Sequence, residues 1–286
     1  MRQTSVERRV IVTADDFGLA IPVNEAVELA HREGILGGAS LMVGAEGAED
    51  AVQRARRLPR LRVGLHIVLV DGRPLLPPAL VPDLVDQDGK FDGTLVRAGF
   101  RFFLLPRVRR HLEAESRAQF EAFRATGLAL DHVNAHRHMH LHPTVLAMIL
   151  RIGRDYGLRA VRLPYEPPSL VRRIGGRPAW TAYASNLLLQ PWIALLRWRV
   201  RRAGLRCNEF VFGLSSSGAM TEETVLRLID CLPAGISELY FHPATAAHAS
   251  LPATGRHQAE LGALISPRVR AALAAAQIQA VSFSEL

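Results

Sequence analysis

Short apolar strands alternate with amphipathic helices along nearly all of the 286 residues. The first strand, residues 9–14, precedes a helix at 22–33 that has a proline near its start and a glycine after its end. Further strands are expected at 39–43, 61–67, 128–135, 158–163, 209–213, 237–243 and 278–283. Because strands that alternate with helices pair in parallel, the sequence predicts an α/β fold.

Further helices are expected between these strands, at 48–58, 107–126, 144–156, 221–231, 256–265 and 267–276. Two segments interrupt the alternation. Residues 71–105 are rich in Pro, Gly and Asp and predict a long loop over the active face. Residues 167–206 form a basic and apolar insertion. An α/β barrel uses about 250 residues as one domain, so residues 1–286 are expected to form a single domain.

The positive charge is concentrated in one part of the chain. The formal net charge is +8, and between Glu166 and Glu209 there are eight arginines and no acid. A nucleic-acid binder would be basic over a recognisable motif, so no nucleic-acid partner is expected. The two cysteines form no disulfide framework, and no run approaches the ~20 apolar residues of a membrane span. We therefore expect a cytoplasmic protein.

Five of the eleven histidines fall within residues 132–143, HVNAHRHMHLHP. From His136 to His142 they occupy every second position, and Pro143 favours a helix start. The cluster therefore lies at a strand-to-helix junction, where α/β folds place their chemistry. Imidazole is the commonest metal ligand at neutral pH. A solvated histidine-rich loop is the alternative, but the apolar flanks LALDHV and VLAMIL favour a metal site.

Polar residues recur where the expected strands end. They are Asp15, Asp16, His66, His136, Arg162 and His242. One carboxylate with the imidazoles of His66 and His136 would form a ligand set that leaves metal positions open, and the second carboxylate could act as a base. Arg162 could pair with Asp15 and orient it. Each residue alone is compatible with a solvated turn or a structural hydrogen bond.

Four motifs together resemble a known family. ADDFG at 14–18, GLH at 64–66, HVNAHRH at 132–138 and HP at 242–243 are similar, in order and spacing, to the YdjC-like (ChbG-type) carbohydrate deacetylases. The segment LPYEPP at 163–168 resembles the branch of that family associated with hopanoid biosynthesis, called HpnK.

This resemblance implies a distorted (β/α) TIM-like barrel that hydrolyses the N-acetyl group of an amino sugar to acetate and a free amine. It implies one divalent ion, Mg or Zn, and three residues as its ligands: Asp16, His66 and His136. It also implies Asp15 as the base and His242 as the acid.

Three more residues are expected around the substrate or behind the ligands: Arg162, His138 and Asn134. Asn134 departs from the family pattern, which usually has Asp two residues before the ligand histidine. An asparagine can still accept a hydrogen bond but brings no charge, so the metal affinity or the working pH would differ.

Two other functions remain open. A metal-dependent phosphoesterase on a barrel would use the His-x-His pairs for several metals, but it needs more carboxylates at strand ends than the sequence offers. A non-catalytic, metal-binding protein docked on a membrane would leave the pair Asp15 and Asp16 unexplained.

The insertion at 167–206 contains all three tryptophans beside its eight arginines. Tryptophan and arginine next to aliphatic residues suit a bilayer interface with anionic lipid. We expect docking on the inner face of the membrane, with access to a lipid-linked sugar such as an N-acetylglucosaminyl hopanoid. The residues expected to dock are Trp192, Trp198, Arg197, Arg199, Arg201 and Arg202. A helix packed on the barrel or a homodimer interface are the alternatives.

Overall fold

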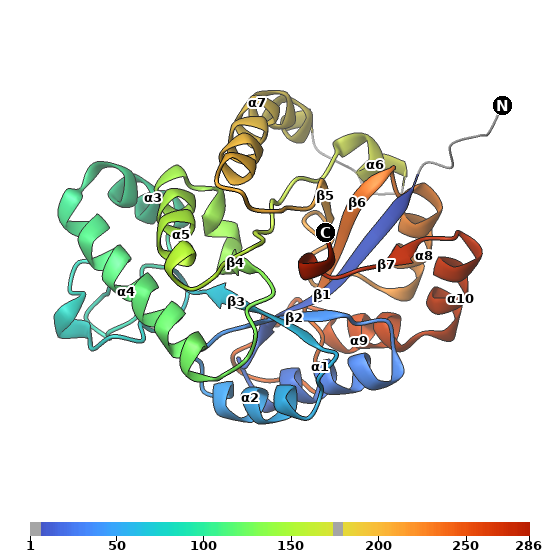
Figure 1. Ribbon diagram of the computed structural model, residues 1–286, viewed down its shortest axis with the longest axis horizontal. Helices are drawn as coiled ribbons and strands as arrows, with labels where there is room; N and C mark the ends of the chain where they lie inside the picture. The colour runs from blue at the N-terminus through green and yellow to red at the C-terminus, as the bar shows by residue number, and fades with distance from the viewer. Residues whose placement is uncertain (1–6, 174–179) are drawn as a thin grey trace.

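A curled parallel sheet lies at the centre of the computed structural model (Figure 1), which describes residues 7–173 and 180–286 and the side chains of all of these except 180–189. Part of the basic insertion, residues 174–179, lies outside the described residues. The strand order is β4-β3-β2-β1-β6-β5, with β7 paired to β1, and every pair of neighbours is parallel. The strands are β1 (Arg8–Phe17), β2 (Gly38–Leu41), β3 (Arg62–Ile67), β4 (Val133–Ala135), β5 (Phe210–Phe212), β6 (Gly235–Phe241) and β7 (Gln279–Ala280).

The central strand β1 fixes where the polar residues meet. Its apolar run is buried on both faces, as is typical of a parallel strand covered by helices. β1 pairs with β6 in unbroken register from Arg8 opposite Gly235 to Ala14 opposite Phe241. Because parallel strands end at the same edge, this register brings Asp15 and His242 to one edge of the sheet.

The sheet curls so that residues 160–165 lie between its two outer strands, β4 and β5. This segment makes only single bridges, Val133 with Val161 and Ala160 with Arg206. The expected strand at 158–163 is therefore not a regular one, in part because Pro164 has no N–H for a ladder. Of the expected barrel, the structure confirms a curled parallel sheet with helices around it.

Helices cover the sheet on all sides in Figure 1. They are α1 (Ile21–Glu33), α2 (Ala48–Arg56), α3 (Leu95–Leu104), α4 (Pro106–Ala125), α5 (Pro143–Asp155), α6 (Pro168–Arg173), α7 (Trp180–Arg202), α8 (Glu222–Cys231), α9 (His257–Ile265) and α10 (Pro267–Ala275). One apolar cluster extends from Val10 to Ile278 and joins the sheet to these helices. Within the described part of the chain, no helix combines the length and the apolarity that a membrane span requires.

The segment 71–105 differs from the expected loop because it contains α3. Leu95, Ala98 and Phe102 recur at helical spacing, and the last two are buried. The prolines and glycines that precede these residues dominate the composition of the segment, so the short stretch of helical apolar spacing is hard to detect in the sequence. The last strand is also shorter than expected, since β7 has two residues and a 3₁₀ turn at Phe283–Glu285 follows it.

Asn208 is expected to hold the irregular segment in place. Its buried side chain accepts a hydrogen bond from Leu163 N and donates to Leu163 O and Phe210 O. Asn208→Ala would leave these backbone groups unpaired and should lower the free energy of unfolding by about 2 kcal/mol or more. Urea denaturation measures this change. Gln53→Ala, which removes an exposed amide, is the control and should change stability by less than about 0.5 kcal/mol. Equal stability of the two variants would contradict the assignment.

Candidate active site

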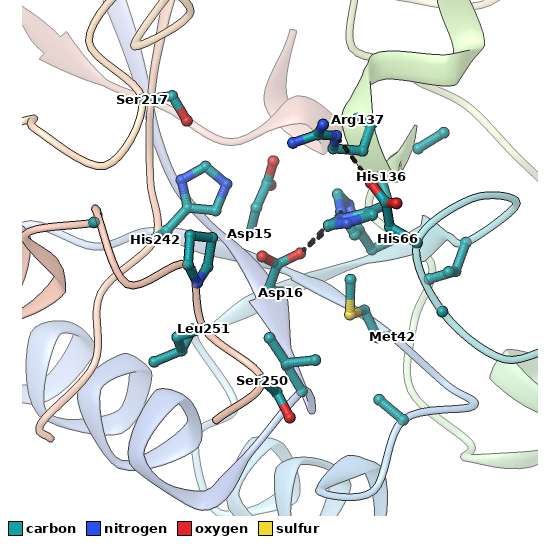
Figure 2. Close-up of a pocket in the computed structure, with 18 of the residues that line it drawn as sticks. Asp15, Asp16, Met42, His66, His136, Arg137, Ser217, His242, Ser250 and Leu251 are labelled. Carbon is teal, nitrogen blue, oxygen red and sulfur yellow. Dashed lines mark hydrogen bonds and ion pairs between the residues drawn. The ribbon is translucent and has the colours of Figure 1, made fainter. Parts of the chain in front are cut away.

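A cavity of about 970 Å³ opens where the strands end. Its wall includes seven residues with titratable groups from β1, β3, β6 and the turn after β4: Asp15, Asp16, His66, His136, His138, Tyr240 and His242. Figure 2 shows Asp15 and Asp16 between His242 on one side and the pair His66 and His136 on the other. Six of these residues were predicted from the sequence, all but Tyr240, whereas the predicted Arg162 and Asn134 lie behind the cavity wall.

Asp16, His66 and His136 form a compact set of possible metal ligands. Asp16 Oδ1 lies 3.3 Å from His66 Nε2 and 3.1 Å from His136 Nδ1, and the two nitrogens are 3.4 Å apart. No other group of three such residues meets this spacing among the described residues. A cation between these three groups would bind the lone pairs that converge there. The set therefore fits a divalent metal bound by one carboxylate and two imidazoles.

A left-handed residue lets both aspartates face the cavity. Neighbours on a regular strand point to opposite faces. Asp16 has φ 60°, and the pairing of β1 with β2 shifts register between Ala14 and Phe17. This conformation costs of order 1 kcal/mol for a non-glycine residue and is found mainly at functional sites. The turn at the end of β1 thus aims Asp15 and Asp16 into the same space.

The amide of Asn134 joins His66, one of the possible metal ligands, to Asp15. Its Oδ1 lies 2.6 Å from His66 Nδ1, and its Nδ2 donates to Asp15 Oδ1 at 3.2 Å. Because a carboxylate only accepts, the amide nitrogen must face Asp15 and the amide oxygen must accept the proton on His66 Nδ1. That proton leaves the Nε2 lone pair of His66 free for a metal. An aspartate at 134 could not donate to Asp15, so the asparagine suits this arrangement.

A second chain of hydrogen bonds supports Asn134 from behind. Asn134 Nδ2 also donates to Ser40 Oγ, which lies 3.0 Å from His132 Nε2. His132 Nδ1 donates to Asp131, which also accepts the backbone N–H of Ser284. Because Nδ1 carries the proton of the neutral ring, Nε2 accepts from the hydroxyl of Ser40. All of these side chains except Ser284 are buried. The direction of every donor is thus fixed from Asn134 to the C-terminal turn.

His132 also needs a glycine across from it. A Cβ on Gly64 would lie 2.5 Å from the His132 ring, which stacks on Phe283 at a centroid distance of 4.6 Å. Position 64 therefore excludes any side chain while His132 is present.

Arg162 is wholly buried and pairs with two carboxylates. It donates to Asp15 Oδ2 at 2.5 Å and Asp15 Oδ1 at 2.9 Å, and to Glu238 Oε1 at 2.7 Å. Thr13 Oγ1 accepts from Arg162 and donates to Glu238. The Tyr240 ring covers the guanidinium, whose carbon lies 5.0 Å from the ring centroid. Arg162 thus ties β1 to β6 as well as orienting Asp15.

These charges keep both aspartates ionised. Burial alone would raise the pKa of Asp15, but Arg162 outweighs it and holds that pKa far below its usual range. Burial opposes ionisation of Asp16 in the same way, and the neighbouring His136 lowers its pKa. Asp15 and Asp16 are thus carboxylates throughout the neutral range.

His138 lines the cavity and stays neutral. Burial, followed by the charge of Arg162, lowers the pKa of His138 to about 3. Its Nε2 lies 3.2 Å from Tyr240 Oη, and both residues line the cavity. Arg137 and His138 have φ of 54° and 55°, so the turn after His136 reverses the chain tightly. His140 turns back instead, and its Nδ1 accepts from Ala135 N.

His242 lines the cavity from the end of β6. Its backbone N–H donates to Glu260 Oε2 at 2.5 Å, and its carbonyl lies 2.6 Å from His257 Nδ1. Its ring packs edge-on against Tyr240, at a centroid distance of 5.4 Å. The backbone of His242 is thus fixed on both sides while its imidazole faces the cavity.

Several residues of this site are not apparent from the sequence motifs. They are Ser40, Glu238, Tyr240, His257 and Glu260. Glu238 and Tyr240 could have been found, because an acid inside the apolar strand ISELYF is unusual and positions 238, 240 and 242 share one face.

The residues expected to dock on a membrane point in different directions. Trp192 is half-buried and donates from its indole to Leu141 O, and Arg197 donates to Glu209 O. Trp198 is 53% exposed, with the Arg202 guanidinium 5.2 Å from its ring. Trp192 and Arg197 therefore pack on the fold, and the exposed face of α7 carries Trp198, Arg201 and Arg202.

The sequence is similar to that of several curated carbohydrate deacetylases. The one from Brevibacillus brevis is 41% identical over 157 residues, and the one from Geobacillus stearothermophilus is 38% identical over 165 residues. These alignments cover 55% and 58% of this chain, and 60% and 62% of the two relatives. The carbohydrate deacetylase of Mus musculus is 32% identical over 312 residues, which cover 97% of this chain and 94% of the relative.

A solved structure shares the fold. It is described as a cellobiose-phosphate cleavage protein from Enterococcus faecalis, and it superposes with a TM-score of 0.75 over 98% of both chains at 22% identity. The sequence profile of the YdjC-like protein family matches residues 9–275, nearly the full length of the chain. Together with the mouse relative, this match confirms the family resemblance of the four motifs: the chain belongs to the YdjC-like family.

Proposed function

We propose that this protein is a metal-dependent carbohydrate N-deacetylase, which hydrolyses the N-acetyl amide of an amino sugar to acetate and a free amine. The observation that carries the proposal is the set Asp16, His66 and His136 beside the ionised Asp15, in a cavity of about 970 Å³. The names of its curated relatives support the same activity. A cavity of this size accommodates a sugar ring and part of its attached group.

Asp16, His66 and His136 would hold the divalent ion. When bound, Mg or Zn polarises the acetyl carbonyl and makes the attacking water more acidic. His66 Nδ1–H donates a hydrogen bond to Asn134 Oδ1, and this bond fixes the tautomer of His66 whose Nε2 lone pair can bind the ion.

Asp15 is placed to accept the proton of the attacking water. Arg162 binds both of its oxygens and Asn134 binds one, so the carboxylate cannot rotate away from the cavity. The same contacts make Asp15 a weak base, because they stabilise its charged form. It can therefore act only on a water whose acidity is already raised.

His242 is placed to protonate the leaving nitrogen. In Figure 2 it stands across the two aspartates from His66 and His136. An acid on that side can reach the amine while Asp15, which lies between His242 and the ligand set, takes the proton of the water. Amide cleavage needs such an acid because the amine is a poor leaving group.

A phosphoesterase is less consistent with this site. His138 and His140, which would have to bind further metal ions, contact Tyr240 Oη and Ala135 N instead. Within the described residues, one candidate ligand set is found.

We also propose that the sugar is attached to a lipid, as in an N-acetylglucosaminyl hopanoid. The LPYEPP segment supports this branch, because Glu166 accepts from Gly213 N and Ser215 N and so shapes the loop that contributes Leu214 and Ser217 to the cavity. Apolar side chains at the cavity wall, Leu19, Met42, Leu75, Leu214 and Leu251, would suit an apolar aglycone. The exposed Trp198, Arg201 and Arg202 on α7, with the partly exposed Arg199, would contact anionic lipid.

Removal of one ligand should abolish metal binding and activity together. His136→Ala leaves two ligands, so the purified variant should contain less than about a tenth of the wild-type metal, since ligand geometry sets affinity. Elemental analysis and acetate release from N-acetylglucosamine oligosaccharides measure the two effects, with and without a chelator. His31→Ala, on α1 away from the cavity, is the control. Full metal content in His136→Ala would show that the ligand set is wrong.

Asp15 and Asp16 should differ in what they control. Asp15→Asn should keep the metal and lower kcat by about 100-fold or more, the scale of general-base catalysis. Asp16→Asn should lose the metal. Metal content and kcat of the two variants, measured side by side, test the assignment. If Asp15→Asn loses the metal and Asp16→Asn retains it, the two roles are exchanged.

The requirement for His242 should depend on the leaving group. His242→Ala should lower the rate of amide hydrolysis by about 100-fold, yet it should hardly affect an activated aryl acetate, whose leaving group needs no proton. The ratio of the two rates is the measurement, and it is insensitive to a general loss of folded protein. An equal loss on both substrates would remove His242 from the role of acid.

A further inference from the structure

The exposed apolar side chains of this protein gather in two places. Among the described residues ten large apolar side chains are exposed, and seven belong to the segment from 75 to 105: Leu75, Leu80, Val96, Phe100, Phe103, Leu104 and Leu105. Two more, Leu195 and Trp198, lie on α7, and the tenth is Ile21. Isolated exposed apolar residues are ordinary, but a contiguous group marks an interaction surface.

Helix α3 presents most of this group on one face. Val96, Phe100, Phe103 and Leu104 recur at i, i+4, i+7 and i+8, and they are 70, 64, 55 and 61% exposed. The opposite face, with Ala98 and Phe102, is buried. α3 lies at the outer edge of the molecule beside α4 and α5 (Figure 1). It is therefore an amphipathic helix whose outer face is apolar.

Arginines flank this apolar face along the chain. Between Asp92 and Glu113 the sequence has five arginines and no acid: Arg97 and Arg101 on α3, and Arg107, Arg109 and Arg110 at the start of α4. Arg97 pairs with Asp92 and Arg107 pairs with Asp83, which leaves an excess of three positive charges. Apolar side chains flanked by cations are typical of a helix that lies in the interface of an anionic bilayer.

The charge favours a lipid surface over a second copy of the chain. In a two-fold dimer the same patch would face itself, so its arginines would lie against one another. A stable interface also places few charges around its apolar core. Anionic headgroups instead complement the arginines, and the aromatic rings of Phe100 and Phe103 can enter the acyl boundary.

The position of α3 connects it to the cavity. Gly93, just before α3, lies against Asp71, and Phe91 N donates to Gly72 O. Asp71 and Gly72 line the cavity, as does the exposed Leu75. On its other side, α3 packs on His142, next to the Leu141 carbonyl that anchors Trp192 of α7. A surface that holds α3 would thus lie close to the wall of the cavity.

We infer that α3 is an interfacial helix, which docks the enzyme on an anionic lipid surface through Val96, Phe100, Phe103 and Leu104. The docking itself depends only on this helix and its arginines. Docking would give the enzyme access to an acetylated sugar held in the membrane, and this second step rests on the proposed deacetylase function. The apolar contact, rather than α7 alone, then determines the affinity for the membrane.

Vesicle flotation with the full chain tests this inference. Wild type should float with vesicles of phosphatidylcholine and phosphatidylglycerol, and less with phosphatidylcholine alone. A variant with Phe100→Ser and Phe103→Ser should bind the anionic vesicles about tenfold more weakly or worse, because both rings lose their insertion. Arg109→Gln with Arg110→Gln should reduce the preference for anionic vesicles. Ile21→Ser is the matched control and should float as wild type.

Acetate release from a soluble oligosaccharide separates docking from catalysis. The α3 variants should keep wild-type activity on this substrate, which also shows that they are folded. Wild type that stays in the soluble fraction with both vesicle types would overturn the inference. So would a wild-type dimer in sedimentation that Phe100→Ser with Phe103→Ser converts to a monomer. If wild type floats but never releases acetate, the docking stands and the proposed function fails.

Discussion

The buried guanidinium of Arg162 is the interaction on which both the sheet and the site depend. It comes from the irregular segment 160–165, which lacks a continuous ladder to either neighbour. Its bonds to Asp15 on β1 and Glu238 on β6 therefore locate that segment as much as its backbone does. Removal of one partner from such a buried ion pair lowers the free energy of unfolding by about 3–5 kcal/mol, because the remaining charge is buried without a counter-charge or water. The active site and the fold of this edge are thus held by the same atoms.

This arrangement also determines what chemistry the site can support. Arg162 is engaged by Asp15 and Glu238, so it makes no ion pair with Asp16. A divalent ion at Asp16, His66 and His136 would neutralise the charge of Asp16, which is a physical reason for the site to suit one. As the proposed base, Asp15 would be rigid but weak because of its contact with Arg162. Positioning, rather than intrinsic basicity, is then what this carboxylate would contribute.

The main features of the fold and the site follow from local patterns in the sequence. Apolar runs gave most strands, and polar residues at their ends marked the edge where the cavity lies. The partners of those residues did not follow, because Glu238 faces Arg162 only through the register of β1 with β6. The left-handed Asp16 and the direction of the side chains at 190–202 on α7 were equally hidden, since composition does not say which face packs inward. Helix α3 was missed because its apolar residues follow helical spacing over only ten positions, directly after a segment rich in proline and glycine.

The contact between Gly64 and His132 has a consequence for how such a site evolves. Gly64 belongs to the GLH motif and His132 opens the HVNAHRH motif, far along the chain. The ring of His132 fills the space in which a side chain at 64 would lie. A mutation that enlarges position 64 would therefore displace the ring that orients Ser40 and Asn134, and through them the proposed ligand His66. The coupling runs in one direction: a lineage could enlarge position 64 only after the ring at 132 had been lost, whereas a change at 132 leaves the glycine compatible with the fold.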